Sequence, residues 1–281
     1  MSSGQPAVTS VIMTRDRRDG LLDNLPRYRR PVILVDNAST DGTPDAVIEA
    51  APDVQVVRLP VNRGAQARNT GVRLARTPYV AFADDDSWWQ DESLDRAALV
   101  LDRHPSIAVL AGRILLHAAE ELDPLCATMA DSPLPDESDL PGVPVLGFAA
   151  CGAVVRRDAF LASGGFDPVV FFGGEESRLA IDLAVAGYDL RYLPELVAHH
   201  NPSPSRAAPG SRAALIARNQ LLTAVMRRPW SVALRDTAEL VRTPVGRRAV
   251  AAALPRVGGA LARRRRVPAH LEHRLRLLGT V

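Results

Sequence analysis

Residues 79–86 read YVAFADDD, an apolar run that ends abruptly in three aspartates. A short, continuous apolar run predicts a buried strand, so the acids fall where strand pairing stops. Three consecutive carboxylates repel one another, and the cluster is costly unless a cation or a metal-bound polyphosphate neutralises it. The alternative is a strand that exits into a solvated acidic turn, because aspartate is a common turn former. The other motifs of the chain favour metal binding.

Strand and helix patterns alternate on both sides of this run. The predicted strands are 8–14, 32–36, 54–59, 79–83, 107–116 and 190–193, and the predicted helices are 44–51, 65–75, 92–103, 158–162 and 175–186. Apolar strands that alternate with amphipathic helices predict an α/β fold with a mostly parallel sheet between helices. Residues 120–147 are rich in proline and acids and predict a long loop.

Charge divides the sequence into two parts. All 34 basic residues are arginines, and 16 of them follow residue 204, whereas only 3 of the 32 acidic residues do. The basic part shows helical patterns at 211–228, 231–241, 246–262 and 268–279. We therefore expect an α/β domain at 1–204 and a basic, arginine-rich helical extension at 205–281.

Composition also points to a cellular setting. Two cysteines, Cys126 and Cys151, are too few for a disulfide framework and predict a reducing compartment. The first residues lack the pattern of a signal peptide and no apolar run is long enough to cross a bilayer, so we expect a cytoplasmic protein. A basic tail can contact anionic lipid, nucleic acid or the acidic body. We expect no nucleic-acid partner, and peripheral contact with the inner face of the membrane is the alternative to a solvated face.

Three polar clusters follow predicted strands, and open parallel sheets bind ligands beyond these carboxyl ends. Asp36 opens VDNASTDGT, Arg63 and Gly64 lie in NRGAQARNTG, and the triple aspartate is the third cluster. An acid at a strand tip can accept hydrogen bonds from a base or a ribose. A glycine before a helix leaves backbone N–H groups free to face phosphate. Arg68, about one turn further on, is expected near the same mouth.

With FADDDS, GGFD, FGGEE and AGYDLRYLPE followed by paired histidines, these motifs form an ordered set. From Val8 to about His200 the sequence resembles a family 2 glycosyltransferase of the GT-A fold. The resemblance implies metal-dependent, inverting transfer of a sugar from a nucleoside-diphosphate sugar to an acceptor hydroxyl. The acceptor is left open between a glycan, a lipid-linked molecule and a small molecule.

The resemblance also implies which residues bind the nucleotide. Thr14 and Asp36 match positions that contact the nucleotide, with Asp36 facing the base. Arg63, Gly64 and Arg68 match the segment beneath it.

A metal site is implied in the same way. Asp84 and Asp86 match the two acids of an Asp-x-Asp motif, with Asp84 nearer the ribose and donor sugar and Asp86 on a cation that bridges the diphosphate. Asp85, between them, is counted with the donor-binding residues. Oxygen ligands and a diphosphate suit Mn²⁺ or Mg²⁺. His199 or His200 lies where several relatives supply a further ligand.

The expected catalytic carboxylate lies at the start of the helix at 175–186. A hydroxyl is a poor nucleophile, so a carboxylate must take its proton in the transition state. Glu176 aligns with the family's base, and Glu175 is the second candidate. Acids in a first helical turn also favour the helix dipole without any catalytic role. Arg178 and Asp182 reverse the charges usual in the family further along this helix, which leaves their pairing open.

Other interpretations are retained. A sugar-phosphate nucleotidyltransferase shares the fold and the acids, but it normally has a glycine-rich loop with a lysine after the first strand, and this chain has no lysine. A catalytically degenerate nucleotide-sugar-binding protein is the non-enzyme alternative. Trp88 and Trp89, just after the acids, are predicted either to stack on a sugar or to pack in the interior.

Overall fold

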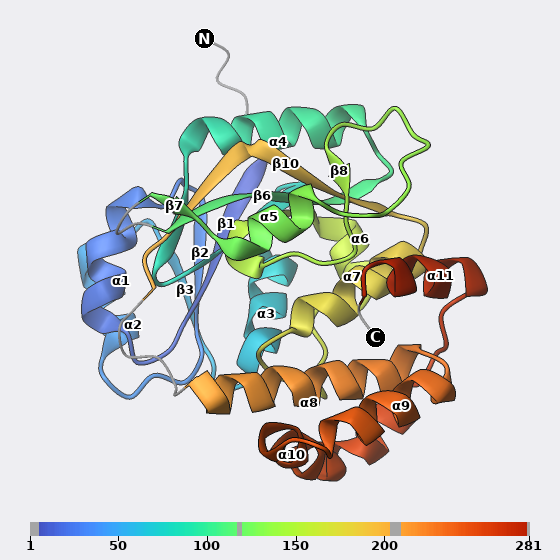
Figure 1. Ribbon diagram of the computed structural model, residues 1–281. Helices are drawn as coiled ribbons and strands as arrows, with labels where there is room; N and C mark the ends of the chain where they lie inside the picture. Colours follow the sequence, from blue (N-terminus) through green and yellow to red (C-terminus); the bar gives the residue numbers. More distant parts are fainter. Residues whose placement is uncertain (1–5, 117–119, 203–208, 280–281) are drawn as a thin grey trace.

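The computed structural model describes residues 6–116, 120–202 and 209–279, which form a ten-stranded sheet with helices on both faces (Figure 1). The strand order is β3-β2-β1-β4-β9-β6-β10-β5, with β7 paired to β6 and β8 to β10. The predicted α/β class, with its sheet between helices and a helical C-terminal part, is confirmed.

The first part of the sheet is entirely parallel. It comprises β1 (Val8–Thr14), β2 (Val32–Asp36), β3 (Gln55–Arg58) and β4 (Tyr79–Asp84). β1 lies between β2 and β4, and β2 is buried along its whole length. Because helices cover both faces, β2 up to Asp36 and β4 up to Asp84 are continuous apolar runs. β1 also contains the buried polar residues Thr9 and Ser10, and the edge strand β3 is exposed at both ends. The carboxyl ends of β1, β2 and β4 therefore meet at one edge.

The rest of the sheet mixes parallel and antiparallel pairs. β9 runs antiparallel to β4 and β6, β10 runs parallel to β6, and β5 runs antiparallel to β10. Because β5 directly follows the three aspartates, its pairing draws the end of β10 toward them. The strands of this part are β5 (Ser87–Trp89), β6 (Ile107–Leu116), β7 (Glu121–Leu122), β8 (Val143–Pro144), β9 (Ala153–Arg156) and β10 (Asp189–His200).

The helices of the α/β part pack on the sheet through three apolar clusters. Val72, Phe160 and Leu179 bring α3, α6 and α7 onto one cluster. Leu94 of α4 and Leu21 of α1 belong to the other two. The helices are α1 (Arg18–Asn24), α2 (Thr43–Ala50), α3 (Ala67–Leu74), α4 (Asp91–Arg103), α5 (Pro124–Ala130), α6 (Arg157–Ala162) and α7 (Glu175–Val185).

Three features differ from the sequence-based expectation. The segment 120–147 was expected to be a long loop, but it contains β7, α5 and β8. Asp123 caps α5 and accepts a hydrogen bond from the Leu125 N–H, whereas β7 and β8 form by pairing with β6 and β10. Helix α1 follows the first strand and had no strong periodic signal. β10 is longer than 190–193 and continues to His200, with a register shift between Leu193 and Val197.

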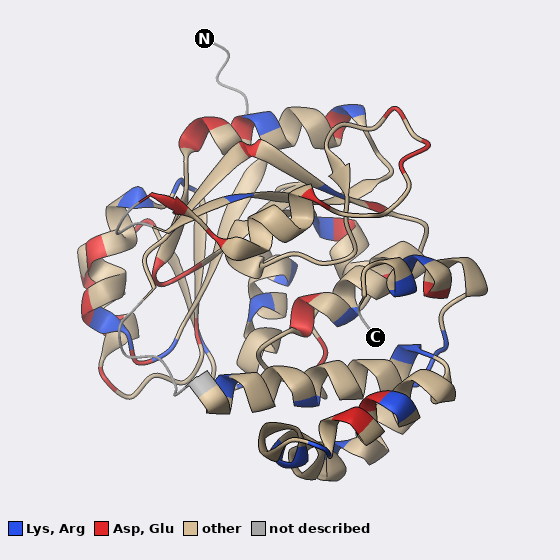
Figure 2. Ribbon diagram, in the orientation of Figure 1, with Lys and Arg blue, Asp and Glu red and all other residues tan. Residues whose placement is uncertain are grey.

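Residues 209–279 of the C-terminal part form four helices, as predicted, and pack against the α/β part. α8 and α10 share an apolar cluster with Val169 and Val170, and α11 shares another with Ile181 of α7. Basic residues are frequent along this part in Figure 2. No helix in the described ranges is long and apolar enough to cross a membrane. The helices are α8 (Pro209–Arg227), α9 (Trp230–Leu240), α10 (Pro244–Ala262) and α11 (Ala269–Leu277).

Candidate active site

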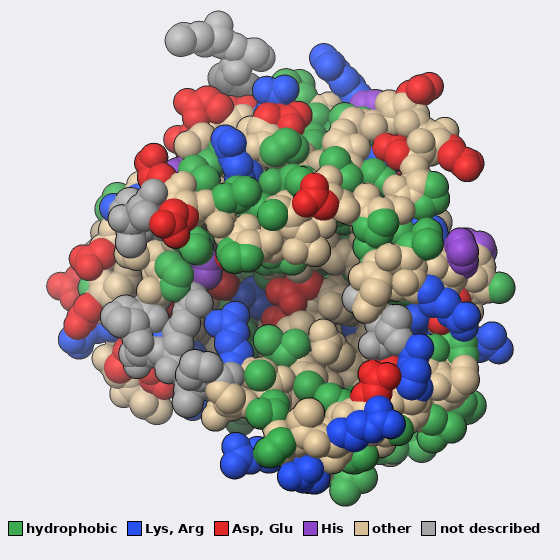
Figure 3. Space-filling model, viewed as in Figure 1, with side chains coloured by type: hydrophobic (Ala, Val, Ile, Leu, Met, Phe, Trp, Pro, Cys, Tyr) green, Lys and Arg blue, Asp and Glu red, His purple; other side chains and the backbone are tan. Residues whose placement is uncertain are grey.

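Parallel pairing brings the candidate nucleotide-binding residues to one edge of the sheet. Thr14 stands opposite Asp36 in the β1–β2 ladder, and Met13 stands opposite Asp84 in the β1–β4 ladder. This is the edge at which open parallel sheets bind ligands. The face seen in Figure 3 is hollowed between the α/β part and the helical tail, and acidic side chains lie inside the hollow.

Asp36 is a buried carboxylate with one satisfied oxygen. Its Oδ2 accepts a hydrogen bond from the Ser39 N–H at 3.2 Å. Its Oδ1 is buried and has no hydrogen-bond partner among the residues that the structure describes. A buried acceptor without a donor is costly, so this oxygen is suited to accept a hydrogen bond from a ligand.

The middle acid of the triplet faces the first strand. The Thr14 hydroxyl donates to Asp85 Oδ2 at 3.0 Å, and the Tyr28 hydroxyl donates to the Asp84 carbonyl oxygen at 3.0 Å. Burial, together with the charges of Asp84 and Asp86, raises the pKa of Asp85 to about 7. The triplet therefore concentrates negative charge that a cation would relieve.

A buried arginine connects the acid triplet to α7. Arg68 is 3% exposed and forms an ion pair with Asp84 at the end of β4. Its Nη1 lies 3.4 Å from Glu175 Oε1 at the start of α7. Glu175 is also 3% exposed, so the bridge runs through the interior and fixes the spacing between the two acidic segments.

Removal of this bridge is expected to destabilise the fold. Arg68→Met leaves Glu175 buried without its cation, and breaking a buried pair in this way costs about 3–5 kcal/mol. Urea unfolding followed by circular dichroism measures the change. Arg63→Met is the matched control, because Arg63 is exposed and should lose no more than about 0.5 kcal/mol. Equal stability of the two variants would contradict a structural role for the bridge.

Glu176 differs from Glu175 in its surroundings. It is half-buried, and the Ala150 N–H donates to its Oε1 at 3.2 Å. Burial and the neighbouring charge of Glu175 raise the pKa of Glu176 to about 8, and burial also raises the pKa of Glu175. A carboxylate with a pKa near the working pH is suited to accept a proton, whereas Glu175 is engaged by Arg68.

Gly64 lies in a close backbone contact, and its N–H already has an acceptor. With φ +57°, it lies against the Phe171 backbone, and a Cβ at this position would collide with the Phe171 carbonyl oxygen. Its N–H donates to Asn62 Oδ1 at 2.8 Å, so this amide does not face a phosphate as expected. Arg63 is exposed beside Gly64, and the Arg63 backbone N–H donates a hydrogen bond to Asn37 Oδ1 at 2.8 Å. Asn37, which the sequence did not single out, thus holds this loop.

The two histidines at the end of β10 point to different neighbours. His200 Nε2 lies 3.4 Å from Asp86 Oδ1. The His199 ring stacks on Trp88, with centroids 5.3 Å apart and an interplanar angle of 13°, and its Nε2 lies 3.3 Å from Gln90 Nε2. Successive residues of a strand face opposite sides, which explains the separation. His200 is therefore the histidine beside the acid triplet.

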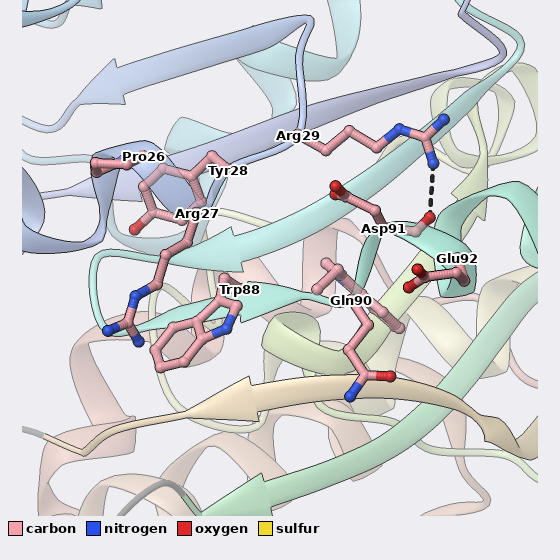
Figure 4. Close-up of a pocket in the computed structure, with 9 residues that line it drawn as sticks. Pro26, Arg27, Tyr28, Arg29, Trp88, Gln90, Asp91 and Glu92 are labelled. Carbon is pink, nitrogen blue, oxygen red and sulfur yellow. Dashed lines mark hydrogen bonds between the residues drawn. The ribbon is translucent and has the colours of Figure 1, made fainter.

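A surface pocket lies behind Trp88 (Figure 4). Its volume is about 350 Å³, and the Arg27 guanidinium lies 4.1 Å from the Trp88 ring centre. Arg29 on its rim donates to the Asp91 carbonyl oxygen at 2.6 Å. Trp88 and Trp89 are 8% and 5% exposed, so both serve in packing, the second of the two roles expected for them.

Arg178 and Asp182, the two residues of α7 whose charges are reversed relative to the family, both form ion pairs, and one partner comes from the C-terminal extension. Arg178 Nη2 lies 2.7 Å from Asp182 Oδ2 and 3.5 Å from Asp167 Oδ2. Arg227 of α8 approaches Asp182 Oδ1 to 2.5 Å. Burial lowers the pKa of Arg178, and these carboxylates oppose that effect. The network links the helix that carries Glu176 to the C-terminal extension.

Two donor groups at the edge lie close enough to ligate one cation. Across the described residues no group of three or more His, Cys, Asp or Glu side chains is arranged to hold a metal ion. Asp86 and His200 nevertheless bring two donor atoms within 3.4 Å of each other. Two ligands of one ion at about 2.1 Å and a right angle are about 3 Å apart, so the pair suits one cation whose other ligands come from elsewhere.

The fold and the site define an α/β protein whose candidate ligand-binding residues lie at the carboxyl edge of its parallel strands. The chain matches the family described as glycosyl transferase family 2 over residues 13–162, more than half of its 281 residues, and it belongs to this family. The family resemblance seen in the sequence is thereby confirmed.

Individual relatives agree with this assignment. The chain is 29% identical over 221 residues to the pre-mycofactocin glycosyltransferase of Mycobacterium tuberculosis strain H37Rv. The match covers 71% of this chain and 44% of that relative, so the chain spans less than half the length of this curated relative.

Solved structures share the fold at low identity. The mannosyltransferase PcManGT from Pyrobaculum calidifontis, in complex with GDP-Man and Mn²⁺, is 22% identical with a TM-score of 0.55 over 92% of this chain and 75% of that one. S. aureus TarS 1–349 in complex with UDP-GlcNAc is 18% identical with a TM-score of 0.54 over 76% of this chain and 66% of that one. These likenesses establish the GT-A type of fold.

Proposed function

We propose that the chain is a metal-dependent, inverting glycosyltransferase that moves a sugar from a nucleoside-diphosphate sugar to an acceptor hydroxyl. One observation carries this proposal: buried Arg68 ties the acid triplet at Asp84 to Glu175, and thereby holds Glu176 at the same edge of the sheet. A transfer between two substrates needs donor and acceptor groups fixed in one site. We assign the chemistry to residues 1–204 and regard residues 205–281 as the basic helical extension.

The donor nucleotide is assigned to the edge formed by β1, β2 and β4. The unsatisfied Oδ1 of Asp36 can accept a hydrogen bond from the base or the ribose. Thr14 lies beside Asp36, and its hydroxyl donates a hydrogen bond to Asp85. Arg63 is exposed in the neighbouring loop and can reach the diphosphate. Arg68 is buried and contributes indirectly, because its ion pair holds Asp84 in place.

Asp86 and His200, with Asp84, are the residues that would hold Mn²⁺ or Mg²⁺. A bound divalent cation neutralises the charge that develops on the departing diphosphate. The proximity of Asp86 Oδ1 to His200 Nε2 supports this assignment, and His199 is assigned to packing because it stacks on Trp88.

Glu176 is the proposed catalytic base. It takes the proton of the acceptor hydroxyl while the acceptor oxygen bonds to the anomeric carbon and the bond to the diphosphate oxygen breaks on the opposite face. Glu175 is engaged by Arg68 and serves to position α7. A single displacement through the acceptor inverts the anomeric configuration.

The donor class is tested by a screen of UDP-, dTDP- and GDP-sugars with Mn²⁺. We expect one nucleotide group to raise the melting temperature and to release nucleoside diphosphate in the assay. Donors of this kind are named with the mannosyltransferase from Pyrobaculum calidifontis (GDP-Man) and with TarS (UDP-GlcNAc). Release of pyrophosphate from a nucleoside triphosphate and a sugar phosphate would instead identify a nucleotidyltransferase. Binding without turnover, whatever the acceptor mixture, would favour a degenerate binding protein.

A further inference from the structure

Two helices of the C-terminal extension present large apolar side chains to solvent. Trp230 and Leu234 on α9 are 49% and 66% exposed. Leu254 and Leu261 on α10 are 67% and 45% exposed. Single exposed apolar residues are ordinary on protein surfaces, but a group of them marks an interaction site. These four residues are called the apolar stripe below.

The stripe continues from one helix to the other. The Arg264 guanidinium, just past the end of α10, lies 3.9 Å from the centre of the Trp230 ring at the start of α9. Leu261 lies about one turn before Arg264, and Leu254 two turns further back. Leu234 lies one turn beyond Trp230. The end of α10 is thus beside the start of α9, and the two halves of the stripe run along neighbouring helices.

The solvent side of α10 has an uncharged middle. Between Arg248 and Arg263 the only charged residue is Arg256. Arg256 turns toward the α/β part, where its Nη1 donates to the Val169 carbonyl oxygen at 3.0 Å. The exposed surface between the two ends of the helix is therefore apolar.

Basic residues border this surface at both ends. Arg247 and Arg248 are exposed near the start of α10, and Arg265 and Arg266 are exposed just past its end. Residues 230–266 hold nine arginines and two acids, a net charge of +7. An apolar surface between basic clusters matches the two layers of a lipid interface, with acyl chains beneath anionic head groups.

We propose that α9 and α10 dock the protein on an anionic lipid bilayer, with the apolar stripe at the acyl boundary and the bordering arginines against the head groups. Charge alone would suit nucleic acid as well, but phosphate contacts make no use of exposed leucines. Burial of apolar area and attraction to anionic lipid act together in such contacts. The proposal is independent of the transfer reaction.

The position of these helices suits such a contact. In Figure 1, α9 and α10 lie at the bottom of the molecule, with α8 between them and the sheet. In Figure 3, hydrophobic and basic side chains gather along this lower rim, and the acidic hollow opens above it. A bilayer beneath α9 and α10 would therefore leave the hollow accessible.

The test uses the full chain with vesicles of phosphatidylcholine alone, or of phosphatidylcholine and phosphatidylglycerol at a two-to-one ratio. Flotation measures the bound fraction at low and at high salt. We expect binding to the anionic vesicles, much weaker binding to the neutral ones, and partial release by salt. Trp230 is a built-in reporter, because Trp88 and Trp89 are buried. Its emission should shift to the blue on binding, and Trp230→Phe should abolish the shift while the protein still floats.

Two double variants separate the apolar and the basic contributions. Leu254→Glu with Leu261→Glu, and Arg265→Glu with Arg266→Glu, are each expected to weaken binding about tenfold or more. All four positions are exposed, so the fold should survive, and thermal melting checks this.

Matched controls carry the same changes of charge on the α/β part. Leu99→Glu with Leu122→Glu replaces leucines that are 56% and 45% exposed, and Arg96→Glu with Arg103→Glu replaces exposed arginines. Both controls should float like the unaltered protein.

Three outcomes would overturn the proposal. One is the same flotation of the stripe variants and their controls. Another is equal binding to neutral and anionic vesicles. The third is a concentration-dependent dimer in sedimentation velocity that the Leu254→Glu, Leu261→Glu variant abolishes, because the stripe would then be covered by a second copy of the chain.

Discussion

Glu176→Gln is expected to lower kcat by about 10²-fold or more while the Kd of the donor stays nearly unchanged. The amide keeps the size of the side chain but cannot take a proton from the acceptor hydroxyl, and general-base catalysis contributes on the order of 10²–10⁴-fold. Steady-state transfer assays give kcat, and titration calorimetry with the donor and Mn²⁺ gives the Kd. Unchanged turnover would assign the base to another residue.

The pH dependence gives an independent check on the same residue. The active form of a base is deprotonated, and the pKa of Glu176 is raised to about 8, so kcat/KM should rise with pH through about 8 and level off only above about 9. The rise should be absent in Glu176→Gln. Glu175→Gln is the matched control, because its carboxyl pairs with Arg68. This variant should keep the rise but move it to lower pH, since the charge of Glu175 no longer raises the pKa of Glu176. If the rise of kcat/KM with pH disappears only in Glu175→Gln, Glu175 would be the base and Glu176 the positioning residue.

Chelation is the second change with a large expected effect. EDTA should abolish transfer, and added Mn²⁺ or Mg²⁺ should restore it. Asp86→Ala should lower kcat/KM by about 10²–10³-fold even at saturating metal, because a cation on the leaving diphosphate supplies several kcal/mol and each 1.4 kcal/mol is a factor of ten. Full activity in the chelator would contradict the metal assignment.

The two histidines allow a finer test of the metal site. His200 lies beside Asp86, whereas His199 stacks on Trp88. His200→Ala should therefore raise the Mn²⁺ concentration needed for half-maximal thermal stabilisation in the presence of nucleoside diphosphate. His199→Ala should leave that concentration unchanged. The opposite result would move the ligand to His199.

Most of the architecture could be predicted because the buried strands carry a strong local signal. Continuous apolar segments such as 32–35 and 79–83 are typical of strands in a sheet that is covered on both faces. The pieces that escaped prediction are held by contacts that are distant in sequence. β5 is three residues long and exists because it pairs with β10, and the end of β10 follows the same pairing.

The candidate site was predictable in its acids but not in what holds them. Asp36, Asp84 and the Glu175–Glu176 pair follow strand ends or begin a helix, which local patterns reveal. The buried contacts of Asn37 and Tyr28 were missed, because an asparagine or tyrosine in a loop carries no such pattern. The choice between His199 and His200 as the metal ligand likewise could not be made from the sequence. It depends on which side of β10 each ring faces.

The contact between Arg227 and Asp182 gives the tail a mechanical consequence for the chemistry. Asp182 lies on the same helix as Glu176, and Arg227 ends the helix on which α9 and α10 rest. A chain cut before α8 would leave Asp182 with Arg178 but without Arg227, and it would remove apolar cover from Val169 and Val170. A tilt of the tail would therefore move α7, whose first turn carries the proposed base Glu176, through this ion pair and through the packing of α11 on Ile181.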